Sequence, residues 1–171
     1  FFPLYRFDRN LKCECGVEDC LAVGKHPRAR NWQNTPLWDA DQVEAMEEYG
    51  HLSSGYGVLC KGLLVIDVDA RNGGVESLKK LYADYPVLEE ACGLEVTTGS
   101  GGGSRHLYYR IDPARALVSH LGEYPGIDFK SSGYVVGPGS HHKSGNVYIA
   151  DGYVDDIGPP PQGIIEALRK K

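Results

Sequence analysis

The sequence predicts an α+β domain with a mixed, mostly antiparallel sheet flanked by helices. Three observations support this prediction. Helical patterns alternate with short β segments, a glycine-rich turn joins two of those segments, and too few helices separate the strands for a doubly wound parallel sheet. A chain of 171 residues suits one domain with its own core, so we expect a single domain over residues 1–171.

The first third of the chain predicts a loop, a helix and a pair of strands. Residues 10–38 are rich in Cys, Pro, Asn and Trp and are expected to be irregular. Residues 39–50 (DADQVEAMEEYG) begin with acids and carry apolar residues at helical spacing, which predicts an amphipathic helix. The segments GYGVLC and LLVIDVD, separated by Lys61 and Gly62, predict a hairpin with a tight turn.

The rest of the chain alternates in the same way. VESLKKLYADYP predicts a helix that ends near Pro86, and LEVTTGS and RHLYYR predict a hairpin around the glycine-rich SGGGS. GIDFKSS and GYVVGPGS continue the β-rich part, and NVYIA closes it. Residues 159–171 predict a C-terminal helix, since proline is tolerated in a first turn.

Composition narrows the classes of protein to which the chain can belong. The net charge of −5 and pI of about 5.7 are a poor match to a bulk nucleic-acid binder, although a local basic groove or a bound metal can reverse the field. No apolar run approaches the ~20 residues that span a bilayer, and the N-terminus lacks the layout of a signal peptide. We therefore expect a cytoplasmic protein with no membrane partner, and a chain trimmed at its start because it begins without Met.

Four potential zinc ligands lie close together near the N-terminus, in the pattern C-x-C-x4-C-x5-H. They are Cys13, Cys15, Cys20 and His26. Thiolates and imidazole are the ligands zinc prefers, and four protein ligands make a closed, structural site. The odd count of five cysteines and the lack of a secretory signal favour metal over disulfides. Residues 10–38 are thus predicted to be a zinc-binding segment; ordinary cysteines in a reducing compartment are the alternative.

Two aspartates, Asp67 and Asp69, end the apolar run LLVIDVD. Side chains two residues apart on a strand share a face, so at about 5–6 Å and a dielectric of about 20 their repulsion is on the order of 3 kcal/mol. A cation must offset this repulsion, unless the pair lies in water as a solvated strand end. Carboxylates suit Mg²⁺ or Mn²⁺, and Asp128 in GIDFK supplies a third acid for two ions.

The stretch TGSGGGSRHLYY combines glycines with polar residues. The glycines let the backbone approach a ligand closely, and Ser104 and His106 share a strand face from which they could contact a polyphosphate. No GK[ST] follows, so this is not a Walker A motif, and a flexible hairpin tip is the alternative. Lys130 shares a face with Asp128 in a regular strand. Four other polar residues are expected to be structural or on the surface: Cys60, Cys92, His51 and His120. His141, His142 and Lys143 could bind phosphates or lie in a solvated loop.

Taken in order, these residues resemble the prim-pol (bifunctional DNA primase/polymerase) domain of the archaeo-eukaryotic primase superfamily. That family has a D-x-D at a strand end, S-x-H on a following strand and a third aspartate after an apolar residue. The matching positions are Asp67, Asp69, Ser104, His106 and Asp128. GKHPR, GYGVLCKGLLVIDVD and GYVVGPGS add to the likeness, which covers roughly residues 3–150. Lys130 stands where many members carry arginine, which keeps the charge but loses the bidentate fork.

The resemblance implies an archaeo-eukaryotic-primase-like catalytic domain with an N-terminal zinc-binding loop. It implies a nucleotidyltransferase that uses two Mg²⁺ or Mn²⁺ ions and a single-stranded DNA template to join NTPs or dNTPs, in primer synthesis and extension. The catalytic metal ligands would be Asp67, Asp69 and Asp128. The residues that bind the nucleotide would be Ser104, His106 and Lys130. Arg105 points to the other strand face and is left out.

The resemblance also suggests a context. Prim-pol proteins often carry a helicase domain after this one, so we expect a piece of a larger replication protein encoded by a plasmid, phage or prophage. The zinc segment would shape the domain, or touch the template or the initiating nucleotide.

Two other functions compete with this one. An aspartyl-phosphate phosphatase would use Asp67 as nucleophile, but it usually has Gly-Thr where this chain has Ala70-Arg71. A non-catalytic, zinc-stabilised module that binds single-stranded or origin DNA is the other alternative.

Overall fold

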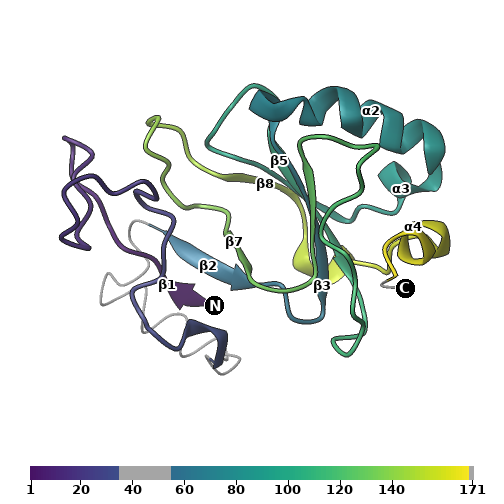
Figure 1. The fold of residues 1–171 in the computed structure, drawn as a ribbon, viewed down its shortest axis with the longest axis horizontal. Coiled ribbons are helices and arrows are strands. Elements are labelled where there is room, and N and C mark those ends of the chain that lie inside the picture. Colours follow the sequence, from purple (N-terminus) through teal and green to yellow (C-terminus); the bar gives the residue numbers. More distant parts are fainter. Residues whose placement is uncertain (35–54, 170–171) are drawn as a thin grey trace.

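Two antiparallel sheets organise the protein (Figure 1). The computed structural model describes residues 1–34 and 55–169. The smaller sheet has the order β1-β2-β7 and the larger sheet the order β6-β3-β5-β4-β8. The strands are β1 (Phe2–Pro3), β2 (Tyr56–Leu59), β3 (Leu63–Val68), β4 (Leu94–Thr97), β5 (Arg105–Arg110), β6 (Ile127–Lys130), β7 (Tyr134–Val136) and β8 (Ile149–Gly152). Every pairing between these strands is antiparallel, and the predicted α+β class is confirmed.

The predicted hairpin between β2 and β3 is wrong, although its tight turn exists. The Leu63 amide donates to the Cys60 carbonyl at 3.1 Å, and Gly62 has a φ of 81°. The strands then enter different sheets, because both edges of β3 are occupied, by β5 and by β6. β2 pairs instead with β1 and β7. The turn is therefore a corner between sheets. The hairpin predicted between β4 and β5 is confirmed.

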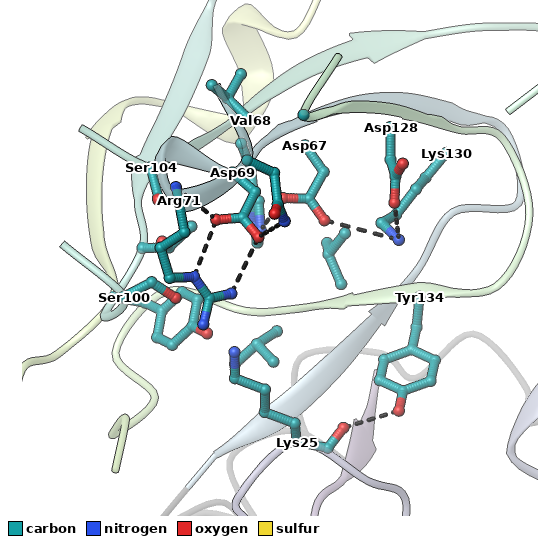
Figure 2. A pocket seen from close by; sticks show the side chains of 17 residues that line it. Lys25, Asp67, Val68, Asp69, Arg71, Ser100, Ser104, Asp128, Lys130 and Tyr134 are labelled. Carbon is teal, nitrogen blue, oxygen red and sulfur yellow. Dashed lines mark hydrogen bonds and ion pairs between the residues drawn. The ribbon is translucent and has the colours of Figure 1, made fainter. Parts of the chain in front are cut away.

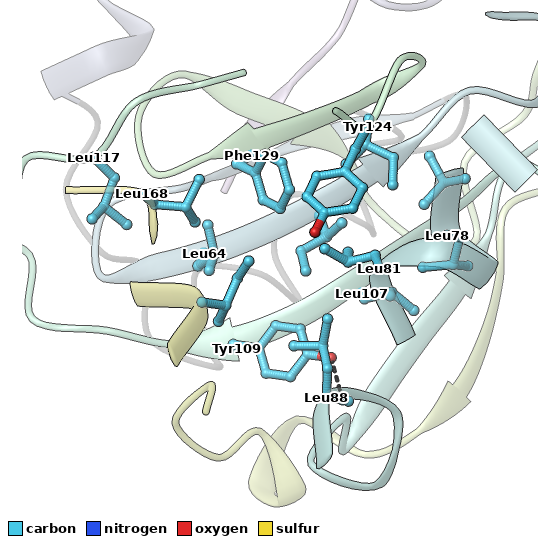
Figure 3. Packing of buried hydrophobic residues seen from close by; sticks show 14 of the residues in the cluster. Leu64, Leu78, Leu81, Leu88, Leu107, Tyr109, Leu117, Tyr124, Phe129 and Leu168 are labelled. Atoms are coloured by element: carbon cyan, nitrogen blue, oxygen red, sulfur yellow. Dashed lines mark hydrogen bonds between the residues drawn. The ribbon is translucent and has the colours of Figure 1, made fainter. Parts of the chain in front are cut away.

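The larger sheet has two different faces, because side chains alternate along each strand. Leu64 and Ile66 of β3 belong to the cluster that packs under the helices (Figure 3). Val65 belongs to a second cluster, which also contains side chains of the smaller sheet. Its buried members are Phe2, Leu4, Cys60, Val65, Leu94, Val96, Tyr108, Val135, Val136, Tyr148 and Ile157. The helices thus cover one face of the larger sheet, and the smaller sheet covers part of the other (Figure 1).

Helix α2 (Gly74–Asp84) confirms the helix predicted before Pro86. Its Leu78 and Leu81 are buried in the cluster under the sheet. The first residue of the helix must be small, because a Cβ on Gly74 would lie only 2.6 Å from the carbonyl oxygen of Gly126. The same Gly126 oxygen accepts from the Asp69 amide at 2.8 Å. The start of α2 and the end of β3 are therefore fixed against the segment that leads into β6.

Two shorter helices complete the helical layer on this face of the larger sheet. Helix α3 (Val87–Glu90) was not predicted; it starts directly after Pro86, which is its N-cap residue. Helix α4 (Gln162–Ala167) confirms the C-terminal helix but is shorter than residues 159–171. Prolines 159 and 160 each precede another proline, which pushes their backbone out of the helical region, and Pro161 itself is extended with a ψ of 141°.

The helix predicted for residues 39–50 lies outside the described residues. None of the described helices has both the length and the apolar character needed to cross a membrane.

A buried hydroxyl joins α3 to the sheet and gives a test of the fold. Tyr109 is fully buried, and its hydroxyl donates to the Leu88 carbonyl at 2.7 Å (Figure 3). Tyr109→Phe leaves that carbonyl without its donor, so we expect the free energy of unfolding in urea to fall by about 1–2 kcal/mol. Tyr153→Phe, at a side chain that is 75% exposed, is the control and should change it by less than about 0.5 kcal/mol. Equal stability of the two variants would contradict the role of this hydrogen bond.

Candidate active site and zinc site

The register of three strands brings predicted site residues together. Asp67 of β3 lies directly opposite His106 of β5 on one side and Asp128 of β6 on the other. Residues directly opposite one another in antiparallel strands point to the same face. Lys130, two residues after Asp128, shares that face as well. Since Val65 precedes Asp67 by two residues, this is the face that meets the smaller sheet.

A cavity of about 440 Å³ opens between the two sheets at this point (Figure 2). All six residues predicted to be catalytic or nucleotide-binding line it: Asp67, Asp69, Asp128, Ser104, His106 and Lys130. Their roles stay a prediction, but they share one space. Strand β7 forms part of the opposite wall. The remaining lining residues are Lys25, Val68, Arg71, Asn72, Thr98, Ser100, Gly126, Tyr134, Val135, Val136 and Tyr148.

Lys130 lies between two carboxylates. Its Nζ is 3.6 Å from Asp67 Oδ2 and 3.5 Å from Asp128 Oδ2 (Figure 2). Burial raises the pKa of Asp67 above its ordinary value, the nearby Asp128 charge raises it further, and the Lys130 ammonium opposes both. The lysine thus provides the positive charge that two neighbouring acids require.

Asp69 is neutralised separately. It is the N-cap of the short 3-10 helix η2 (Ala70–Asn72), and its Oδ1 accepts from the backbone amide of Arg71 at 3.0 Å. The Arg71 guanidinium donates to both carboxylate oxygens at 3.0 Å, and the Asn72 amide adds a bond of 2.9 Å. The hydrogen bonds from Arg71 lower the pKa of Asp69 below its ordinary value. The repulsion expected between the two aspartates is therefore met by two different cations.

His106 is a buried, neutral imidazole. Only 5% of the residue is exposed, and burial, with the nearby lysine charges, lowers its pKa to about 3. Its Nε2 lies 3.5 Å from Asp67 Oδ1. Among the described residues its Nδ1 has no hydrogen-bond partner, although it is buried. A buried nitrogen without a partner is costly, so burial of this ring carries a penalty that no described group offsets.

The glycine-rich loop between β4 and β5 is held in a defined shape. Ser104 Oγ accepts from the Ala70 amide at 3.0 Å, which ties the end of the loop to the turn after Asp69. The Gly99 carbonyl accepts from Ser144 Oγ at 2.7 Å and from the Asn146 side chain at 3.2 Å. The loop therefore rests on a neighbouring one and presents Ser100 and Ser104 to the cavity.

Two other polar residues near the loop do not line the cavity. Arg105 pairs with Glu95 at 3.0 Å, as strand alternation predicted when Arg105 was left out of the site. His142 is buried behind Gly99, where a Cβ on the glycine would lie 2.1 Å from the histidine Cβ. The imidazole of His142 bonds Ser144 Oγ at 2.9 Å, so it supports the loop.

Sequence reasoning missed three residues of the site. Arg71 follows Asp69 by two residues, a spacing that could have suggested the ion pair. His120, 70% exposed and expected to be a surface residue, has its Nε2 3.2 Å from Asp128 Oδ1. Lys25 lines the cavity from the predicted zinc-binding segment, although it was noted only as part of GKHPR. Nothing in the spacing of His120 or Lys25 pointed to the acids.

The donor chemistry of the cavity fits divalent cations. Carboxylate oxygens are the ligands that Mg²⁺ and Mn²⁺ prefer. The Lys130 ammonium lies between Asp67 and Asp128, where a metal ion bound by these two acids would also supply positive charge. Within the described part of the chain, however, the three acids do not form one compact donor cluster, because Asp69 is turned toward Arg71. Asp69 would have to leave its arginine to act as a ligand beside the other two.

A second group of donors could hold zinc. Ligand atoms of Cys13, Cys15, Cys20 and His26 all lie within 4.8 Å of one another. His26 Nε2 is 3.1 Å from Cys13 Sγ and 3.5 Å from Cys20 Sγ. Burial raises the pKa of the Cys13 thiol to about 11, so a cation is needed to hold it as a thiolate. Four protein ligands leave no open position, which fits a structural site.

The comparison with known proteins agrees with the resemblance in the sequence. Residues 4–162 match the family described as bifunctional DNA primase/polymerase, N-terminal, or Prim-Pol. No curated protein and no solved structure matches the chain. The matched span contains the cysteine and histidine cluster, the whole larger sheet, strands β2 and β7 of the smaller one, and every residue of the cavity. The chain therefore belongs to the Prim-Pol family of bifunctional DNA primase/polymerase N-terminal domains.

Proposed function

We propose that the chain catalyses template-directed nucleotidyl transfer from NTPs or dNTPs, with two divalent cations, in the synthesis and extension of primers. The observation that carries the proposal is the adjacent register of Asp67, His106 and Asp128 inside one cavity. Family membership supports a DNA template and a nucleotide as substrates. A single domain over residues 1–171, a following helicase domain, and a plasmid, phage or prophage origin stay predictions.

Metal binding is proposed at the three carboxylates. When bound, two Mg²⁺ or Mn²⁺ ions would lower the pKa of the attacking 3′-hydroxyl and neutralise charge on the reacting phosphates. Asp67 and Asp128 would hold them, with Asp69 joining after it leaves Arg71. Lys130 would leave its position between the acids, because two cations cannot share it.

The remaining side chains would bind the triphosphate. Lys130, once released from the acids, would supply a positive charge to it. Once Asp67 turns to the metals, Nε2 of the neutral His106 would be free to donate one hydrogen bond to a phosphate oxygen without adding charge. Ser104 lies at the end of the glycine-rich loop, where the absence of side chains lets backbone amides approach phosphate oxygens. These roles for Ser104, His106 and Lys130 follow from their position around the acids.

One alternative draws on an observation of the same cavity. Each acid already has a cation as partner, since Lys130 contacts Asp67 and Asp128, and Arg71 holds Asp69. A site balanced in this way could belong to a DNA-binding module without catalysis. The phosphatase alternative has no such support, because it requires a doubly wound sheet and the described strands are antiparallel.

The main test removes one charge from the cavity. Asp67→Asn keeps the size of the side chain but loses a metal ligand, so we expect de novo synthesis to fall by at least about 10²-fold. The assay supplies single-stranded DNA, labelled nucleotides and Mg²⁺ or Mn²⁺, and products are followed on a gel. Circular dichroism and thermal melting should show that the variant is folded.

Glu76→Gln is the matched control, since Glu76 is an exposed acid of α2 outside the cavity. It should leave synthesis unchanged. An Asp67→Asn chain that still makes primers would refute the catalytic assignment. A wild-type chain that binds DNA in a salt-dependent way but makes no product with either metal would favour the binding module.

The zinc site gives a separate prediction. We expect about one zinc per chain by elemental analysis, because four ligand atoms make one closed site. Cys20→Ser should lose most of the zinc and lower the melting temperature, since binding at roughly a thousandfold excess over Kd contributes about 4 kcal/mol to folding. Cys92→Ser is the control: Cys92 lies outside the cluster, donates to the Leu94 carbonyl, and should keep its zinc as serine. Full zinc content in Cys20→Ser would contradict the assignment.

A further inference from the structure

One cationic side chain of the cavity, Lys25, has no carboxylate partner among the described residues. Lys25 is half-buried and lines the cavity on the side opposite Asp67 and Asp69 (Figure 2). Among the described residues it forms no ion pair, whereas Lys130 and Arg71 each contact a carboxylate. An ammonium that is partly withdrawn from water, without a fixed counter-charge, is suited to an anionic ligand that enters the cavity.

The backbone of Lys25 is fixed from the side of the smaller sheet. Its carbonyl accepts from the Tyr134 hydroxyl at 2.7 Å, and Tyr134 is the first residue of β7 (Figure 2). Its amide donates to the Ala22 carbonyl at 2.9 Å. The preceding Gly24 has a φ of 70°, and a Cβ there would lie 2.7 Å from the ring of Phe7. The turn that carries Lys25 therefore has little freedom to move.

The zinc cluster fixes the same residue from the other side. His26, the next residue, belongs to the cluster, and its ring lies 4.8 Å from that of Tyr5, centroid to centroid. The His26 carbonyl also accepts from the Tyr5 amide at 2.9 Å. Loss of a metal ion bound by His26 would remove one of the contacts that fix this end of the turn. The position of Lys25 in the cavity thus depends on the cluster as well as on β7.

We propose that Lys25 binds the triphosphate of the incoming nucleotide, and that the zinc cluster serves catalysis by holding Lys25 in the cavity. This inference rests on the proposed function and extends it. A lysine ammonium binds phosphate oxygens as a point charge. Lys25 would hold the triphosphate from the wall opposite the acids, while Lys130 acts from their own sheet. The zinc segment is then a part of the nucleotide site.

The test measures binding without turnover. The zinc-loaded chain is titrated with a fluorescent dATP analogue in Mg²⁺ without template, and in parallel with the matching dAMP analogue and with labelled single-stranded DNA. Lys25→Ala should weaken the binding of the triphosphate about tenfold, as expected for the loss of one charge-assisted contact, and leave the other two ligands and the zinc content unchanged. Lys25→Arg should recover part of the affinity because it keeps the charge.

Lys12→Ala is the matched control, since Lys12 is an exposed lysine of the same segment that does not line the cavity. It should bind the triphosphate as the parent does. Lys25→Ala with parental affinity for the triphosphate would overturn the inference. So would weaker binding of DNA alone, because Lys25 would then contact a backbone phosphate of the DNA.

A second comparison tests the link to zinc and does not depend on a substituted ligand folding well. Zinc is removed with a chelator from the parent and from Lys25→Ala, and both are titrated again with the triphosphate below the melting temperature of the zinc-free chains. Removal should weaken the parent about tenfold and change Lys25→Ala little, because the two changes act through one contact. Fully additive losses would overturn the coupling. If the parent itself binds no triphosphate, the proposed function fails; if it makes primers while Lys25→Ala binds normally, only this inference fails.

Discussion

The candidate site depends on the register of β3 between its two neighbours. Asp67 and Asp128 are opposite one another, and directly opposite like charges destabilise a sheet. Lys130 offsets this cost, and the uncharged His106 on the third strand adds no further charge. A slip of one residue would turn Asp67 toward the apolar cluster under the helices. The apolar alternation that builds the core of the sheet therefore also fixes the position of the acids.

The cavity exists because β2 and β3 diverge after a turn that local sequence rules assign to a hairpin. β3 carries Asp67 in the larger sheet, while β2 pairs with β7, whose residues line the opposite wall. The two sheets remain joined by the apolar cluster that contains Val65 and Val135. Where this cluster ends, the cavity separates the two sheets. Polar residues can therefore line both of its walls without packing against one another.

The sequence was sufficient for features that depend on local pattern. The alternation in β3, the helical spacing of α2 and the glycine-rich turn before β5 each predicted an element that is present. The partners of β2 could not be predicted, because pairing between residues distant in the chain depends on which strands bury the most apolar surface. His120 and Lys25 were missed for a similar reason. Each comes near the acids through the path of its loop, and that path leaves no periodic signal in the sequence.

The balance of charge in the cavity explains how an acidic chain could bind a polyanion. Three carboxylates and three cations line the cavity: Asp67, Asp69, Asp128, Lys25, Arg71 and Lys130. His106 stays neutral, so the formal charges of these groups cancel. A nucleoside triphosphate carries roughly four negative charges and two divalent ions bring as many positive ones, so the ligands enter together without net charge. The acids can then turn to the metals and the lysines and arginine to the phosphates. On this argument the net charge of −5 lies elsewhere on the chain, and it does not oppose nucleotide binding at the site.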